Sequence, residues 1–143
     1  MKRTLVCALL VIGVAAAVTA VAAGKGVVMS ASDMKWMDNA ALKGAKQTVL
    51  WGEPAKGPYG AIKSIPGGTA MGPHTHSADE KAVVVSGTLE FNFEGEAKKE
   101  LGAGSYVSIP ANAVHDVTCK AGADCVYFEE AAGPADYKRV DKK

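Results

Sequence analysis

Most of the chain consists of short segments in which apolar and polar residues alternate. Residues 88–93 show the pattern most clearly, because Leu89, Phe91 and Phe93 stand at every second position with polar residues between them. A two-residue period places alternate side chains on opposite faces of a β-strand. Further strands are expected at residues 47–51, 59–65, 82–85, 105–109, 115–119 and 125–129, mostly separated by glycine or proline. Many short strands of this kind predict an all-β domain, either an antiparallel barrel or a sandwich of two sheets.

The N-terminal segment follows a different pattern. Two basic residues open it, an uncharged run follows over residues 5–18, and the sequence Ala-Val-Ala-Ala stands at 20–23. A basic start, an apolar run and small residues at a cleavage position are the parts of a secretory signal peptide. We therefore predict that residues 1–23 are a signal peptide, cleaved after Ala22 or Ala23. The alternative is an uncleaved membrane anchor, since the apolar stretch has about the 20 residues that a span requires.

Removing this segment changes the charge balance and leaves one domain. The chain has 143 residues and a formal net charge of +1. Residues 24–143 contain 14 basic and 15 acidic residues, and their number suits one compact domain. The basic residues are scattered, without interleaved aromatic residues, which argues against nucleic-acid binding. We expect this domain to work in the periplasm or outside the cell, without stable membrane association.

Two cysteines remain in the domain, on either side of a short loop. Cys119 and Cys125 enclose residues 120–124, between the last two predicted strands, which we expect to pair as a hairpin. An even number of cysteines in an oxidising compartment favours a disulfide. The chain-entropy account assigns such a small ring about 2 kcal/mol of stability. The alternative is a pair of free, half-buried thiols.

The three histidines are candidate metal ligands. His74 and His76 are two positions apart, so on a strand their imidazoles project from the same face. Glu80 follows beyond a turn, and His115 begins a later strand, from which it could approach from the facing sheet. Three imidazoles and one carboxylate suit a divalent transition metal such as Mn, Fe, Zn, Ni or Cu. The alternative is that these residues serve packing or hydrogen bonding.

The spacing around the histidines resembles the two sequence motifs of cupins. The first motif matches Gly68, five residues, His74-Thr75-His76, three residues, Glu80, six residues and Gly87. The second matches Gly104, five residues, Pro110, one residue, Asn112, two residues and His115. The resemblance implies a single-domain cupin, a small antiparallel double-stranded β-helix (jelly roll), with metal-ligand roles for His74, His76, Glu80 and His115. A looser resemblance, carried by Asp33, Trp36 and residues 50–54, is to the cupin domains of zinc-dependent anti-sigma factors.

Two positions depart from the second motif. Asn112 stands where cupins usually have glycine, but asparagine tolerates a left-handed turn better than most residues. Cys119 stands where cupins often have asparagine, at a position that is not a metal ligand in the family. The resemblance also leaves room for a homodimer through sheet faces, which exposed edge strands would permit.

The residues around the metal follow from the expected hairpin. If loop 120–124 is symmetric, Val117 lies opposite Tyr127 and His115 lies opposite Glu129, and directly opposed residues share a face. Tyr127 and Glu129 would then point into the barrel as general base or as orienting residues. A register slip of one residue would turn both outward.

Other residues leave alternatives open. Tyr106 and Ser108 are equally candidates for the barrel wall. Lys63 is either an anion-binding residue or a surface lysine. The polar C-terminal tail, residues 136–143, is expected to be a solvated end.

Three functions fit these residues. The first is an exported metal-dependent enzyme, with open coordination positions for a small oxygenated or carboxylate substrate. Cupins with these ligands resemble dioxygenases, decarboxylases, isomerases and lyases, and the fold does not choose among them. The second is a non-catalytic barrel that binds or senses a small ligand through its metal. The third is a protein-interaction domain with a vestigial site.

Overall fold

The structure, a computed structural model, describes residues 25–39 and 41–141. The predicted signal peptide, residues 1–23, lies outside the described residues. Among those that are described, helical structure is confined to a 3-10 turn at Ala31–Asp33. None of the helices in this part of the chain has the length and apolar character needed to cross a membrane.

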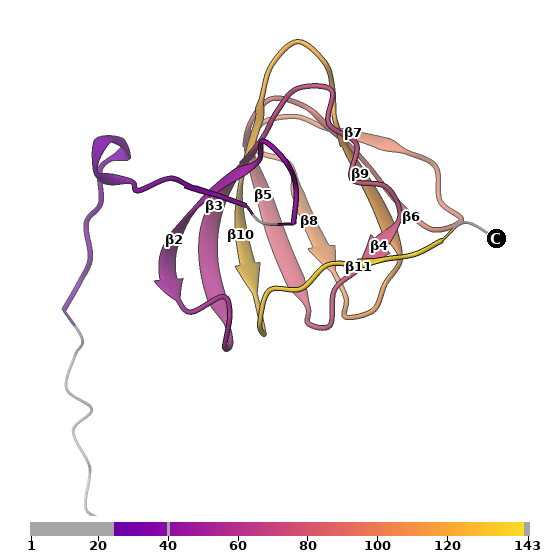
Figure 1. Ribbon diagram of the computed structural model, residues 1–143. Helices are drawn as coiled ribbons and strands as arrows, with labels where there is room; N and C mark the ends of the chain where they lie inside the picture. Colours follow the sequence, from indigo (N-terminus) through magenta and orange to yellow (C-terminus); the bar gives the residue numbers. More distant parts are fainter. Residues whose placement is uncertain (1–24, 40, 142–143) are drawn as a thin grey trace, which may run out of the picture.

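Two antiparallel sheets make up the domain. The strands are β1 (Met37–Asp38), β2 (Lys46–Gly52), β3 (Tyr59–Ile65), β4 (His74–Thr75), β5 (Glu80–Ser86), β6 (Leu89–Phe93), β7 (Lys99–Leu101), β8 (Tyr106–Ile109), β9 (His115–Cys119), β10 (Cys125–Ala131) and β11 (Lys138–Arg139). One sheet has the order β1-β2-β3-β10-β5-β8 and the other β11-β4-β9-β6-β7. Figure 1 shows them as two facing layers. This jelly roll confirms the predicted all-β fold class.

The interior between the sheets is apolar at one end and polar at the other. The inward residues of β10 alternate as a strand requires, and Cys125, Tyr127, Glu129 and Ala131 are all buried. The apolar end holds a cluster of buried side chains from both sheets: Ala45, Ile65, Ala82, Val84, Leu89, Cys119, Cys125 and Tyr127. The polar end holds the buried histidines and glutamates. The strands therefore carry a hydrophobic core at one end and present polar side chains at the other.

The expected hairpin between residues 115–119 and 125–129 is wrong. Strand β9 pairs with β4 and β6, whereas β10 pairs with β3 and β5 in the other sheet. Loop 120–124 therefore crosses between the sheets. The predicted disulfide, Cys119–Cys125, is present with its Cα atoms 5.8 Å apart, so it links the two sheets. Tyr127 and Glu129 still point inward, because the inner faces of both sheets line one cavity.

Two turns of the motifs depend on a left-handed backbone. Gly87 has φ +77°, and a Cβ there would lie 2.6 Å from the carbonyl oxygen of Asp124. Any other residue would thus clash with the loop that joins the two sheets. Asn112 has φ 62°, which confirms that asparagine replaces the usual glycine without losing the turn.

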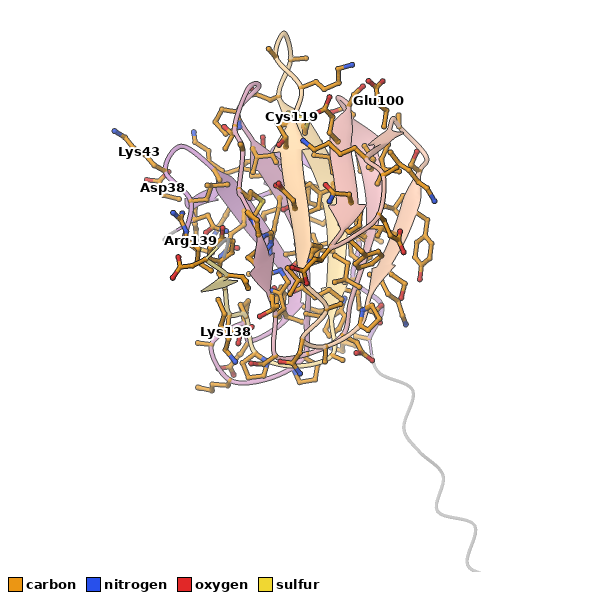
Figure 2. All side chains as sticks on the ribbon, turned by 90° about the vertical axis from the view of Figure 1, so that its right-hand side faces the viewer. Asp38, Lys43, Glu100, Cys119, Lys138 and Arg139 are labelled. Atoms are coloured by element: carbon orange, nitrogen blue, oxygen red, sulfur yellow. A yellow bond between two sulfur atoms is a disulfide. The ribbon has the colours of Figure 1, made fainter. Side chains whose placement is uncertain are left out.

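Within its described residues, 136–141, the C-terminal tail packs against the barrel, contrary to the prediction of a solvated end. Strand β11 pairs with β4, with Arg139 opposite His74. The hydroxyl of Tyr137 donates a hydrogen bond to the carbonyl of Met71. In Figure 2, Arg139 lies on the left side of the barrel with Lys138 below it, and Cys119 lies near the upper end. The tail therefore covers the edge strand that carries the first motif, at the end of the barrel opposite the disulfide.

Candidate metal centre

The three histidines meet at the polar end of the barrel. One ring nitrogen from each of His74, His76 and His115 lies within 4.8 Å of the others. The three side chains are buried, with exposed fractions of 1%, 9% and 1%. His115 does not approach from the facing sheet, as the sequence suggested, because it pairs directly with His74 in the same sheet. Direct pairing fixes the two imidazoles side by side, with ring centroids 4.2 Å apart.

Backbone carbonyls fix the orientation of all three rings. Nδ1 of His74 lies 2.7 Å from the carbonyl oxygen of Gly72, and Nδ1 of His115 lies 3.0 Å from that of Ala113. Nδ1 of His76 lies 2.6 Å from the carbonyl oxygen of Asp136. A carbonyl only accepts, so each neutral ring must donate from Nδ1 and leave the lone pair of Nε2 free. Hydrogen bonds of this kind orient metal-binding histidines.

Burial keeps these imidazoles neutral. It lowers the pKa of His74 to about 4, and it also lowers the pKa values of His76 and His115 below their ordinary value. Desolvation disfavours the charged ring, and neighbouring imidazoles add to the lowering of the pKa values of His74 and His115. Neutral imidazole is the form that binds a metal.

Glu80 reaches this cluster from the other sheet. It begins β5, its side chain is buried, and its carboxylate lies 3.5 Å from Nε2 of His76. Burial, with the nearby Glu129 carboxylate, raises the pKa of Glu80 to about 8. A divalent ion would stabilise the ionised form of this carboxylate.

Three ionisable side chains beside Glu80 form a hydrogen-bonded group, which we call the charged network: Tyr59, Lys63 and Glu129. Oε1 of Glu129 lies 2.5 Å from Nζ of Lys63 and accepts a hydrogen bond of 2.6 Å from the Tyr59 hydroxyl. Burial alone would lower the pKa of Lys63, but the Glu129 carboxylate raises it above its usual range. Burial and the same carboxylate raise the pKa of Tyr59. The network thus holds a buried ammonium against a buried carboxylate.

The structure also shows which of the other candidate residues face the interior of the barrel. Tyr127 is buried on the inner face of β10, opposite Lys63 on β3, and burial raises the pKa of its hydroxyl. Lys63 is therefore not a surface lysine. Tyr106 and Ser108 are exposed on the outer face of β8 and do not form the wall, because β8 turns Val107 and Ile109 inward instead.

The metal-ligand candidates border a small inner cavity that opens into a larger pocket. The inner cavity has a volume of about 60 Å³, and its wall includes the three histidines, Glu80, Glu129 and Tyr127. The larger one, which we call the mouth pocket, has a volume of about 540 Å³ and lies between residues 41–47 and 135–137. Lys63, Met71, His76 and Tyr127 line both. A ligand in the mouth pocket can thus contact His76.

Sequence reasoning missed two residues of the tail that support the site. Besides accepting from His76, Asp136 accepts hydrogen bonds from the backbone N–H and the hydroxyl of Ser77. The ring of Tyr137 stacks on His74 with centroids 4.5 Å apart. The only sequence signal was an aromatic residue in an otherwise polar tail, and no motif connects it with the histidines 60 residues away.

The donor set fits a divalent transition metal. Three neutral imidazoles with free Nε2 atoms could form a metal site, and the Glu80 carboxylate lies beside them. Imidazole suits Zn, Cu, Fe and Ni, while a carboxylate favours harder ions such as Mn. These side chains border a cavity whose wall also includes apolar side chains such as Phe91 and Ile109. The arrangement thus leaves room for a further ligand beside the ion, as a catalytic or ligand-binding metal requires.

Comparison with known proteins places the chain in a family. A family model described as a domain of unknown function, DUF4437, matches residues 19–139. The chain belongs to the DUF4437 family. No protein of curated function matches it.

Solved structures show the fold of this DUF4437 member. It is similar to the polyketide cyclase RemF from Streptomyces resistomycificus (TM-score 0.68, 17% identity, covering 83% of this chain and 88% of that one). It is also similar to an RmlC-like cupin from Shewanella frigidimarina (TM-score 0.62, 19% identity, covering 78% of this chain and 93% of that one). A third similar structure is a predicted oxalate decarboxylase from Thermotoga maritima (TM-score 0.63, 17% identity, covering 75% of this chain and 99% of that one). The domain has the cupin fold. At these identities the likeness shows the fold alone, and the resemblance to anti-sigma-factor cupins stays a prediction.

Proposed function

We propose that this chain is a metal-dependent cupin enzyme that binds and transforms a small oxygenated or carboxylate molecule. The observation that carries the proposal is the free Nε2 of three buried imidazoles facing a carboxylate-bearing wall. His74, His76, Glu80 and His115 would hold one divalent ion. When bound, such an ion polarises a coordinated oxygen or activates a water molecule.

The residues opposite the histidines supply acid–base groups. Glu129 is within the same cavity and already accepts two hydrogen bonds through one carboxylate oxygen, Oε1. Its carboxylate would accept a proton from the substrate. The Tyr127 hydroxyl would donate a hydrogen bond to the substrate. The neighbours named as a cyclase and a predicted decarboxylase support an enzyme, and they leave the class open among oxidation, decarboxylation, isomerisation and elimination.

A metal analysis tests the ligand assignment. The chain is purified without chelators beside His74→Ala, His115→Ala and Thr75→Ala, the last being the residue between two proposed ligands. We expect about one ion per chain in the natural protein and in Thr75→Ala. The two histidine variants should hold less than a tenth of that amount. Equal metal content in all four proteins would contradict the assignment.

A turnover assay separates the enzyme from its main alternative, a non-catalytic ligand-binding or sensor barrel. The metal-loaded chain is incubated with a panel of small carboxylates and enolisable ketones, with and without dioxygen, and products are identified by mass spectrometry. Glu129→Gln should keep the metal and lose turnover by about 10²–10⁴-fold. Binding of a panel compound without conversion would favour the sensor barrel instead.

We also propose that residues 1–23 direct export and are removed. The buried disulfide Cys119–Cys125 supports this, because such bridges persist in oxidising compartments. N-terminal sequencing of protein recovered from a periplasmic extract should begin at Ala23 or Gly24. An intact N-terminus in the membrane fraction would favour the anchor.

A further inference from the structure

We infer that the mouth pocket and inner cavity together bind an amphipathic monoanion, with Lys63 contacting its anionic head. The inference rests on the proposed function, since it takes one divalent ion to be bound by the histidines and Glu80. It adds the ligand's charge, its shape and the residue that recognises it.

The charges of the metal-loaded site favour one negative charge on the ligand. Three of the four metal ligands are neutral rings, and Glu80 contributes one negative charge. Lys63 and Glu129 cancel each other at 2.5 Å. The divalent ion therefore leaves one net positive charge in a largely buried site, because the four metal ligands and Glu129 are 1–9% exposed and the Lys63 side chain is 15% exposed. A buried uncompensated charge is costly, so a monoanion fits this site better than a neutral molecule or a dianion.

Lys63 has a hydrogen-bond donor to offer. Its ammonium group carries three protons. Two have partners among the described residues: the Glu129 carboxylate at 2.5 Å and the Tyr59 hydroxyl oxygen at 3.5 Å. Lys63 borders both the inner cavity and the mouth pocket, and only 15% of its side chain is exposed. The third proton can therefore be donated to an anion that lies between Nζ and the metal ligands.

The two spaces differ in size and lining. The inner cavity, about 60 Å³, admits a head group of only a few atoms. The mouth pocket, about 540 Å³, has the volume of a small-molecule site. Its apolar lining consists of Ala41, Leu42, Ala45, Ile65, Met71 and Ala135. The ligand thus has a small anionic head and a larger, mostly apolar body.

The carboxylate at the rim of the mouth pocket does not oppose an anion. Asp136 is bonded to the backbone N–H and the hydroxyl of Ser77, and it lies 3.4 Å from Nζ of Lys138. On the other side of the pocket, Asn39 and Gln47 are bonded to each other. Asp136, Asn39 and Gln47 therefore have polar partners. Two lysines line the mouth pocket, the exposed Lys46 and Lys63, and of these two only Lys63 also borders the inner cavity.

Calorimetric titration of the metal-loaded chain with three probes tests the inference. Benzoate has the charge and the apolar body, benzamide is its neutral counterpart, and acetate lacks the body. We expect benzoate to bind at least tenfold more tightly than either of the others. Equal affinity for benzoate and benzamide, or no measurable benzoate binding, would overturn the inference.

Paired variants test the role of Lys63. Because Lys63→Met alone leaves Glu129 buried and unpaired, the informative variant is Lys63→Met with Glu129→Gln, which keeps the net charge of the site. It should weaken benzoate binding at least tenfold and change benzamide binding by less than twofold. The matched control is Lys81→Met with Glu130→Gln, an exposed pair 3.9 Å apart on the outer face of β5 and β10, which should change neither.

The outcomes separate the two proposals. A chain that holds no metal overturns the proposed function and this inference with it. A chain that holds the metal but keeps full benzoate affinity in the inner double variant overturns the role of Lys63 alone.

Discussion

The two walls of the cavity hold their functional side chains by different means. On the five-stranded sheet and the loop after β4, hydrogen bonds to backbone carbonyls orient three imidazoles. On the six-stranded sheet, Tyr59, Lys63 and Glu129 hold one another through side-chain contacts. Backbone carbonyls stay in place when a neighbouring side chain changes, whereas a side-chain network loses its balance when one member is removed. We therefore expect the metal wall to tolerate single substitutions around it and the charged wall to respond as a unit.

The largest effect should come from breaking the charged network. Glu129→Ala leaves the Lys63 ammonium buried without its partner, so the free energy of unfolding should fall by about 3–5 kcal/mol. Urea unfolding in the presence of a chelator measures this without a contribution from metal. Glu130→Ala, on the exposed side of the same strand, should cost less than about 1 kcal/mol. Equal losses in the two variants would show that the network does not stabilise the fold.

Removing the metal should have the next largest effect, and it depends on the histidine wall. At a free metal concentration 100 times the dissociation constant, binding stabilises the folded chain by about 2.7 kcal/mol. Unfolding with zinc and with a chelator should differ by this amount in the natural chain and not in His115→Ala. Unchanged stability of the natural chain would contradict the proposed site.

Deleting residues 136–143 should weaken metal binding without removing a ligand. The deletion takes away the carbonyl that accepts from His76 and the ring that stacks on His74. Loss of such orienting partners typically raises the metal dissociation constant by about 10–100-fold. Chelator competition measures the constant, and circular dichroism verifies that the sheets remain. Arg139→Ala, which keeps Asp136 and Tyr137, should stay within about twofold, and a deletion that binds as tightly as the natural chain would contradict this role for the tail.

The smallest expected effect is the number of protons released when the metal binds. The raised pKa of Glu80, about 8, means that its carboxyl is mostly protonated at pH 7 in the metal-free chain. The histidines, with lowered pKa values, are already neutral. Metal binding at pH 7 should therefore release about one proton, decreasing towards zero above pH 9. Calorimetry in buffers of different ionisation enthalpy measures the release, and Glu80→Gln should abolish it.

The sequence predicted the strands and the candidate ligands from local patterns. Local alternation of residue type and the glycine or proline between segments placed β3, β6, β9 and β10 within a few residues. The motif spacing indicated His74, His76, Glu80 and His115, which the structure brings to one cavity. The short strands β1, β4, β7 and β11 were not predicted, since two or three residues show no period.

Local sequence patterns did not predict which strands pair with each other. The short loop 120–124 favoured a hairpin, but the same length also lets the chain cross between two facing sheets. The inward orientation of Glu129 and Tyr127 was nevertheless right, because a strand's buried face is the same whichever neighbour it pairs with. The support given by Asp136 and Tyr137 was missed, since contacts across 60 residues have no spacing signature.

The sequence by itself indicated the longer strands, the left-handed turn at Asn112, the disulfide partners and, through the two motifs, the candidate ligands. The strands, the turn and the disulfide depend on residues close together in the chain, and the candidate ligands follow from the spacing of the motifs. Only the tertiary structure decided that Lys63 is buried against Glu129, that the tail supports the histidines, and that a mouth pocket opens onto them. Such features arise from packing between distant segments, where the burial of a charge depends on which partner the fold brings to it.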